Sequence, residues 1–161
     1  MKMTDFMVPE AFVPNLESTE RDDVIRELVA GLVAADKIKA EDKEDIIEKL
    51  CERERQGSTG IGKGIAVPHV KHPSIETITG TIGRSVEGVN FNSLDKAPVF
   101  SVLLLLSPPN DPDKHLEAME KVFSHLQRDM FRKFLRQAET TEEVVELLKE
   151  AEESPGTEDF S

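Results

Sequence analysis

The chain is poor in the features that mark exported and membrane proteins. It has one cysteine, Cys51, in 161 residues, which excludes an internal disulfide. No apolar run approaches the roughly 20 residues that a membrane-spanning helix needs. The N-terminal residues show no basic stretch followed by a long hydrophobic one, so no signal peptide is expected. We therefore expect a cytoplasmic protein that does not insert directly into a membrane.

Positive charge is also scarce. Lysine and arginine number 20 against 32 acidic residues, which gives a formal net charge of −12 at pH 7. Such a surface repels the phosphates of nucleic acid, so no nucleic-acid partner is expected. It favours a protein partner with a basic face, although most of the acidic residues belong on solvated helix faces.

The order of apolar patterns predicts the class of fold. A chain of this length buries roughly 70% of its unfolded surface around one core. Helical and strand periodicities alternate in a way that predicts an α/β fold, a mixed β-sheet flanked by helices on both sides, in a single domain over residues 1–152. Residues 153–161 are acidic and contain proline and glycine, and we expect them to form a disordered tail. The expected helices are 18–36, 40–55, 113 onward, 130–137 and 140 onward, and the expected strands are 65–67, 77–85, 89–91 and 99–106.

Local patterns sharpen these expectations. Ser18 or Thr19 is placed to cap the first helix, whose apolar face comprises Val24, Ile25, Leu28, Val29, Leu32 and Val33. The last helix starts with the capping box Thr140-Thr141-Glu142-Glu143, and periodicity predicts that Leu116, on the helix from residue 113, points inward. Cys51 falls in the apolar register of the second helix, which indicates a core residue rather than a reactive thiol.

Residues 57–69 form a glycine-rich loop that leads through a short apolar run to a histidine. They read G-S-T-G-I-G-K-G-I-A-V-P-H. The loop can aim backbone N–H groups at an anion, and the following strand delivers His69. A neutral imidazole attacks phosphorus near pH 7 and releases it again, because its ordinary pKa is about 6.5. The pattern suits a phosphoryl group carried on His69.

A nucleotide-binding P-loop is the competing interpretation, because Gly57 to Lys63 fits G-x-x-x-x-G-K. That motif requires Ser or Thr next, as a ligand for Mg²⁺, and then a helix. Gly64 stands in that place, and Pro68 would break a helix in its first turns. The sequence therefore argues against a P-loop.

The stretch Thr59 to His69 carries a specific resemblance. It matches T-G-I-G-x-G-I-A-x-P-H, and the match extends upstream to Arg53-Glu54 and downstream to the Ser107-Pro108 turn and His115. In these residues the chain resembles the enzyme IIA domains of the bacterial phosphoenolpyruvate-dependent sugar phosphotransferase system, of the fructose, mannitol and nitrogen-regulatory type. The resemblance covers roughly residues 3–150 and implies the same α/β fold.

The resemblance also implies a function. His69 would accept a phosphoryl group from the histidine phosphocarrier protein and pass it to a cysteine of a IIB component, for sugar uptake and phosphorylation. The alternative is a regulatory IIA protein of the nitrogen-related branch, whose phosphorylation state controls its binding to a kinase or transporter. A degenerate domain kept only for binding is a third interpretation, against which the presence of His69, His115 and Arg53 speaks. No cofactor is implied.

Four further residues are candidates for the site. The resemblance assigns His115 as a hydrogen-bond donor to the phosphoryl group, whereas in isolation it reads as an exposed residue of a helix's first turn. Arg53 offers a planar cation for a phosphate or a partner's carboxylate, or else complements the dipole at a helix C-terminus. Ser58 and Thr59 are weaker candidates for phosphate binding.

No metal site is expected. His69 and His72 have two residues between them, without a cysteine or acidic residue at a known zinc spacing, and His115 and His125 fall on different sides of a helix.

Overall fold

The computed structural model describes residues 1–153, which form a single α/β domain around a mixed five-stranded sheet. Strand β5 lies in the middle. It runs parallel to β2 and β3 on one side and antiparallel to β4 on the other, and β1 pairs antiparallel with β2. The strands are β1 (Gly60–Gly62), β2 (Ile65–Ala66), β3 (His69–Lys71), β4 (Thr79–Val89) and β5 (Val99–Ser107). The predicted fold class is confirmed.

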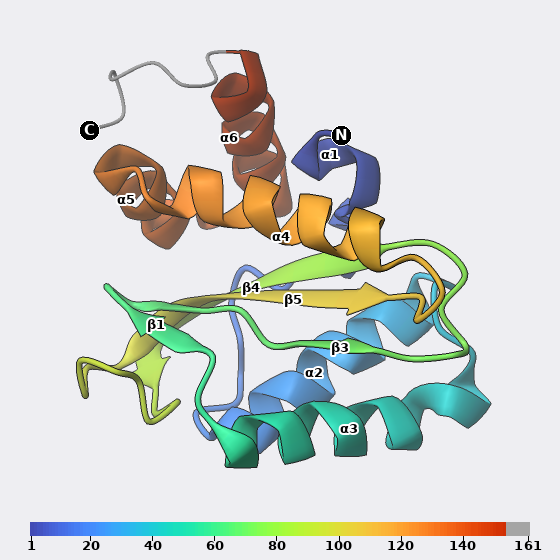
Figure 1. Ribbon diagram of the computed structural model, residues 1–161. Coiled ribbons are helices and arrows are strands. Elements are labelled where there is room, and N and C mark those ends of the chain that lie inside the picture. The colour runs from blue at the N-terminus through green and yellow to red at the C-terminus, as the bar shows by residue number, and fades with distance from the viewer. Residues whose placement is uncertain (154–161) are drawn as a thin grey trace.

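Helices cover both faces of this sheet (Figure 1). On one face lie α2 (Arg21–Ala34) and α3 (Lys43–Gln56), and on the other lie α1 (Met3–Phe6), α4 (Pro112–Leu126), α5 (Asp129–Gln137) and α6 (Thr141–Glu153), with 3-10 turns at Pro9–Ala11 and Ala40–Asp42. Each face has its own hydrophobic core, because alternate side chains of β5 point to opposite sides. Leu103 and Leu105 join the core under α4, whereas Leu104 and Leu106 join the core over α2 and α3. Within residues 1–153 no helix has both the length and the apolar content that crossing a bilayer requires.

The first long helix begins later than expected. Helix α2 starts at Arg21, and neither Ser18 nor Thr19 caps it. The Glu27 carboxylate instead accepts hydrogen bonds from the backbone N–H groups of Glu17 and Ser18, which keeps that segment extended. The expected apolar face is confirmed, since Val24, Ile25, Leu28, Val29 and Leu32 are buried.

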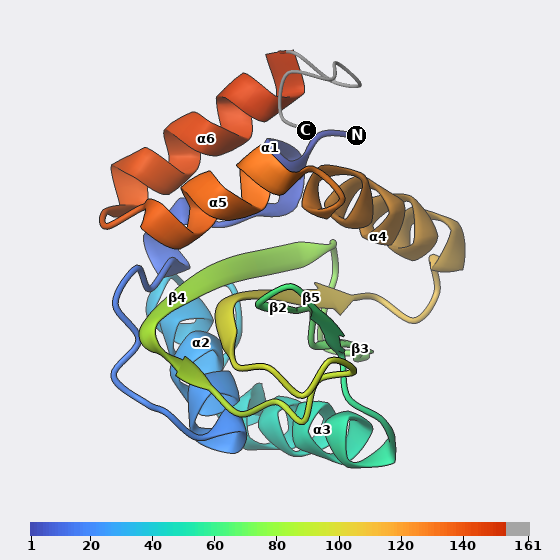
Figure 2. The same cartoon turned by 90° about the vertical axis from the view of Figure 1, so that its left-hand side faces the viewer.

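The two strands expected at 77–85 and 89–91 are one strand. Strand β4 is continuous to Val89, with a break in its register on β5 between Arg84 and Val89. Such a bulge bends a strand, and β4 curves across the sheet in Figure 2.

The C-terminal helix has the expected cap. The Thr140 hydroxyl accepts a hydrogen bond from the Glu143 backbone N–H at 3.1 Å, which fixes the start of α6. Glu153 is the last residue of that helix, so the tail predicted from residue 153 begins inside α6 by one residue. The rest of it, 154–161, lies outside the described residues.

Cys51 is a core residue, as expected. Its side chain belongs to the core over α2 and α3. Burial, together with the nearby Asp22 carboxylate, raises the pKa of the thiol to about 11, so the unreactive thiol form prevails at neutral pH.

His125 lies on the other face of the sheet, inside the core under α4. Only 2% of it is exposed, its ring stacks on Phe131 with centroids 5.4 Å apart, and neither ring nitrogen has a hydrogen-bond partner in the described structure. Burial, and then the charge of Arg128, lowers the pKa of this imidazole to about 4. His125 is therefore neutral at pH 7.

His125→Leu should reduce the loss of stability in mild acid. In the unfolded chain this histidine is protonated below its ordinary pKa of about 6.5, whereas in the folded chain it stays neutral down to about pH 4. The free energy of unfolding therefore decreases as the pH is lowered between these values, by up to about 1.4 kcal/mol per pH unit. Leucine has no such proton to bind. Urea unfolding at pH 7 and pH 5 should show a smaller pH-dependent loss in the variant. Equal losses in the two proteins would contradict this assignment.

Candidate functional site

His69 is held by the central strand. Strands β2 and β3 form one line beside β5, with Ile65 opposite Ser101 and His69 opposite Leu105. Pro68 interrupts this line because it has no N–H to donate, but its carbonyl accepts a hydrogen bond from the Leu105 N–H at 3.0 Å. His69 therefore begins β3, rather than ending the preceding strand as the sequence suggested.

The backbone determines which nitrogen of His69 carries a proton. Nδ1 lies 2.7 Å from the Val67 carbonyl oxygen. A carbonyl oxygen only accepts hydrogen bonds, so Nδ1 is the protonated nitrogen. In the neutral ring Nε2 then carries the lone pair that is available to attack an electrophile.

His115 faces His69 from the first turn of α4. This helix starts at Pro112, one residue before its expected start, since proline is tolerated at the first helical position. The Asp111 side chain caps it by accepting from the Lys114 N–H. The rings of His69 and His115 are 5.9 Å apart between centroids and tilted by 40°. The predicted pair of histidines is therefore brought together.

Ser107, at the end of β5, orients the second histidine. Its hydroxyl oxygen lies 2.6 Å from Nδ1 of His115. Burial, followed by the proximity of His69 and of Lys71, lowers the pKa of His115. When Nδ1 of this neutral ring accepts a hydrogen bond from the Ser107 hydroxyl, the ring's own proton resides on Nε2, which makes Nε2 a donor for a bound anion.

Sequence reasoning missed two features of this region. From the sequence, Ser107 was identified only as part of the Ser107-Pro108 turn. It lies at the C-terminal end of a buried strand, the position at which α/β sheets gather functional groups. Leu116 was expected to point inward by helical periodicity, but 58% of it is exposed. It lies beside His115 in sequence, on the same first turn of α4.

Arg53 is tied to the loop that precedes β1. Its Nη1 donates to the Gly57 carbonyl oxygen at 2.7 Å, just beyond the C-terminus of α3. This contact agrees with the interpretation of Arg53 as a helix C-terminal cation. Its action on a phosphate stays a prediction.

The hydroxyls of Ser58 and Thr59 already have protein partners. Ser58 donates to the Phe91 carbonyl oxygen at 2.5 Å and accepts from the Gly60 N–H at 2.9 Å. Thr59 donates through its hydroxyl and its N–H to the buried Glu54 carboxylate. A phosphate would have to replace these bonds, and the phosphate-binding role of the two residues stays a prediction.

The glycine-rich loop is a tight β-hairpin between β1 and β2. Gly62, Lys63 and Gly64 all have positive φ, at 95°, 58° and 79°. The Lys63 N–H donates to the Asp95 carboxylate, so it is not directed at an anion. Strand β2 follows where a P-loop requires a helix, which explains in structural terms why the P-loop pattern is incidental.

His72 has a structural environment of its own. Its Nε2 lies 2.6 Å from the Asp45 carboxylate on α3 and its Nδ1 lies 2.7 Å from the Ser74 hydroxyl. Residues 1–153 contain no group of three His, Cys, Asp or Glu side chains placed to hold a metal ion.

Comparison with known proteins identifies the family. The sequence profile of the family described as phosphoenolpyruvate-dependent sugar phosphotransferase system, EIIA 2, matches residues 5–151. The chain belongs to this family.

Both transport and regulatory relatives are similar to this EIIA domain. The fructose-specific EIIABC component of Bacillus subtilis is 35% identical over 93% of the chain, although the chain spans only 23% of that longer protein. A nitrogen regulatory protein of Bradyrhizobium diazoefficiens is 32% identical over 92% of the chain and 95% of its own length. Among solved structures, the nitrogen regulatory protein IIA-Ntr of Neisseria meningitidis superposes with a TM-score of 0.80 at 29% identity, covering 89% of this chain and 97% of that one.

Proposed function

We propose that this EIIA domain carries a phosphoryl group on Nε2 of His69, accepts it from the phosphohistidine of the histidine phosphocarrier protein, and passes it to a cysteine of a IIB component. The observation that carries the proposal is the contact of Nδ1 of His69 with the Val67 carbonyl, which leaves Nε2 as the nucleophile. The transfer supports sugar uptake and phosphorylation.

The transfer is balanced without a separate acid or base. The donor's phosphorylated ring carries a proton on its other nitrogen. Nε2 of His69 attacks phosphorus as the donor's P–N bond breaks, and the donor ring keeps the bonding electron pair and that proton, so it leaves as a neutral imidazole. The His69 ring becomes cationic, with phosphorus on Nε2 and the proton still on Nδ1. The Val67 carbonyl oxygen is placed to stabilise that cation, because its hydrogen bond to a charged donor is stronger than one to a neutral donor.

His115 supplies a positioned donor to the phosphoryl oxygens. Such donors are the main catalytic contribution in phosphoryl transfer, since charge spreads over the three oxygens in the transition state. The bond between His115 and Ser107 holds the imidazole in place, and its lowered pKa avoids repulsion between two charged rings.

A protein partner fits the surroundings of the two histidines. Leu116 is a large apolar residue, mostly exposed, next to His115. One solved structure of similar fold, with a TM-score of 0.72 at 19% identity, is described as a complex of enzyme IIAMTL with phosphorylated enzyme IIBMTL from Escherichia coli. That description supports a IIB component as the acceptor here.

The regulatory role is the second candidate. The superposition on IIA-Ntr, at a TM-score of 0.80, is better than that on the E. coli IIA mannitol structure, at 0.72. In that role the state of His69 controls binding to a kinase or transporter. Onward transfer to candidate IIB components separates the two roles, since a regulatory protein passes its phosphoryl group to none of them.

Incubation with phosphoenolpyruvate, the first enzyme of the system and the phosphocarrier protein should add one phosphoryl group, at His69. The label should be lost in acid and survive in base, because a P–N bond hydrolyses when its nitrogen is protonated. Mass spectrometry measures the stoichiometry. His69→Ala should take up none, and equal labelling of that variant would refute the proposal.

His115→Ala should still be phosphorylated at His69 but should transfer onward roughly 10²-fold more slowly, the usual cost of one lost donor. Rapid-quench measurement of both half-reactions tests this. His115→Gln, which keeps an N–H donor, should recover part of the rate. Equal and mild slowing of both half-reactions in His115→Ala would show that His115 is only a surface residue.

A further inference from the structure

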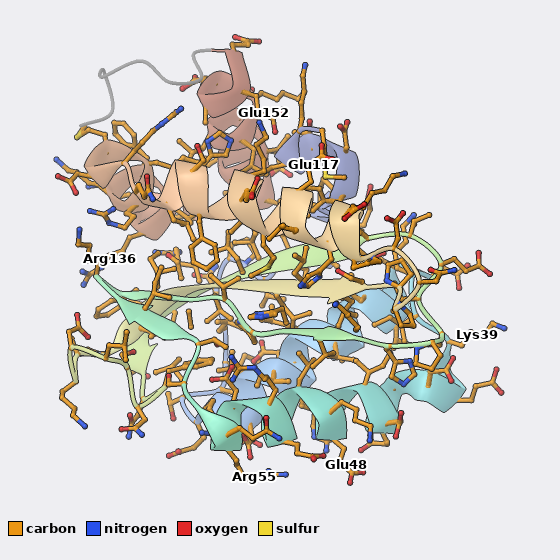
Figure 3. The ribbon with its side chains drawn as sticks, viewed as in Figure 1. Lys39, Glu48, Arg55, Glu117, Arg136 and Glu152 are labelled. Carbon is orange, nitrogen blue, oxygen red and sulfur yellow. The ribbon has the colours of Figure 1, made fainter. Side chains whose placement is uncertain are left out.

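A large basic hollow lies at the other end of the sheet from the two histidines. It has a volume of about 930 Å³ and is formed by the β1–β2 turn, β4 and α5. A smaller hollow of about 350 Å³ adjoins it and shares Lys63, Arg132 and Arg136. Arg136, labelled in Figure 3, lies over the β1 end of the sheet. The cations around the larger hollow are Lys63, Arg84, Arg132, Lys133 and Arg136, against the acids Asp129 and Glu139.

Only some of these cations are needed by the fold. Arg84 donates to the carbonyl oxygens of Pro14 and Arg136 and to the Asn15 side chain, so its role is structural. Arg132 is paired with Asp129. Within residues 1–153, Lys63, Lys133 and Arg136 form no ion pair with a carboxylate. Three cations without an ion-pair partner thus line this hollow, in a chain whose net charge is −12.

Lys63 stands where the backbone favours glycine. Its φ is 58°, between two glycines with φ of 95° and 79°, and L-residues other than glycine adopt this region at a cost. Asp95 stabilises the turn by accepting the Lys63 N–H at 3.0 Å. Because glycine would satisfy this turn better, the turn itself does not explain the lysine. Lys63 is exposed and lines both hollows, and a role there accounts for a lysine at this position.

Arg136 is pre-organised for an anion. Its guanidinium carbon lies 3.6 Å from the centroid of the Phe100 ring, so the planar group is stacked over the ring face. A guanidinium that contacts a ring face in this way keeps its N–H groups available as donors, and its planar fork matches the oxygens of a phosphate. Lys133 stands three residues before Arg136, on the same side of α5.

We propose that this hollow is a second binding site of the domain, for a small organic molecule that carries at least two phosphate groups. One phosphate binds between Lys133 and Arg136, and the other binds Lys63 on the β1–β2 turn. The larger hollow has the volume of a small-molecule site, which in proteins runs from about 300 to about 1,000 Å³. Phe100 and Leu105, which mark the two ends, are separated by roughly 17 Å along β5 at about 3.3 Å per residue. The site is therefore distinct from His69.

Isothermal titration of the full chain at low salt tests the proposal. Fructose 1,6-bisphosphate is the probe, and fructose 6-phosphate and inorganic phosphate are the comparisons. The bisphosphate should bind at least about tenfold more tightly than either monophosphate, since only it reaches both cation groups. Equal affinity for all three, or no binding of the bisphosphate at millimolar concentration, would overturn the proposal.

Three variants locate the site. Lys63→Gly and Lys133→Gln should each weaken binding of the bisphosphate by about fivefold or more, while Lys149→Gln, which removes an exposed lysine on α6, should leave it unchanged. Lys63→Gly should unfold at no lower temperature than the wild type, because glycine suits the positive φ. An equal loss of bisphosphate affinity in the Lys149 variant would show that the effect comes from net charge alone, and it would refute the proposed site.

Two further titrations distinguish this site from an anion site at the histidine pair and from a binding site for an acidic peptide. His69→Ala should bind the bisphosphate as the wild type does, so this test stands even if the phosphoryl-carrier role fails. Loss of binding in His69→Ala would place the anion at the histidine pair instead. Hexaglutamate should bind at least about tenfold more weakly than the bisphosphate. Tighter binding of the peptide would show that the hollow receives an acidic protein segment.

Discussion

The hydrogen bond between Nδ1 of His69 and the Val67 carbonyl is the interaction on which the proposed chemistry depends. It requires the ring to fold back over its own backbone, and the buried Pro68 between the two residues fixes that approach. Strand β5 determines where the two histidines lie. Leu105 holds the backbone of Pro68 and lies opposite His69, and Ser107, two residues further, binds His115. One central strand therefore positions both imidazoles.

The two ends of that strand have different electrostatic character. At the C-terminal end the two histidines meet, and burial keeps His115 neutral near pH 7. In the transfer that we propose, one ring carries the doubly negative phosphoryl group and the other hydrogen-bonds it. At the N-terminal end the β1–β2 turn and α5 gather lysine and arginine around Phe100. The glycine-rich segment connects these ends. Its turn presents Lys63, and its last residue is His69.

Much of the fold followed from the sequence because its causes are local. The apolar face of α2, the core position of Cys51 and the buried strand at Val99–Leu106 all rest on periodicity, and all three are confirmed. The predicted start of α2 was wrong, because the Glu27 carboxylate holds the preceding segment outside the helix. The predicted division of β4 into two strands was also wrong, because pairing with β5 keeps it continuous. The meeting of His69 with His115 came from the family resemblance. The tautomer of His69 and the role of Ser107 depend on a backbone carbonyl and on a strand end, neither of which a residue pattern reveals.

The attachment point of phosphorus on His69 tests this account most directly. Two-dimensional NMR correlation of ³¹P with the ring nitrogens of ¹⁵N-labelled, phosphorylated protein distinguishes the two positions. The account predicts phosphorus on Nε2, with a proton retained on Nδ1 and protected by the Val67 carbonyl. Phosphorus on Nδ1 would contradict it, because that nitrogen could not then donate to the carbonyl oxygen that holds the ring.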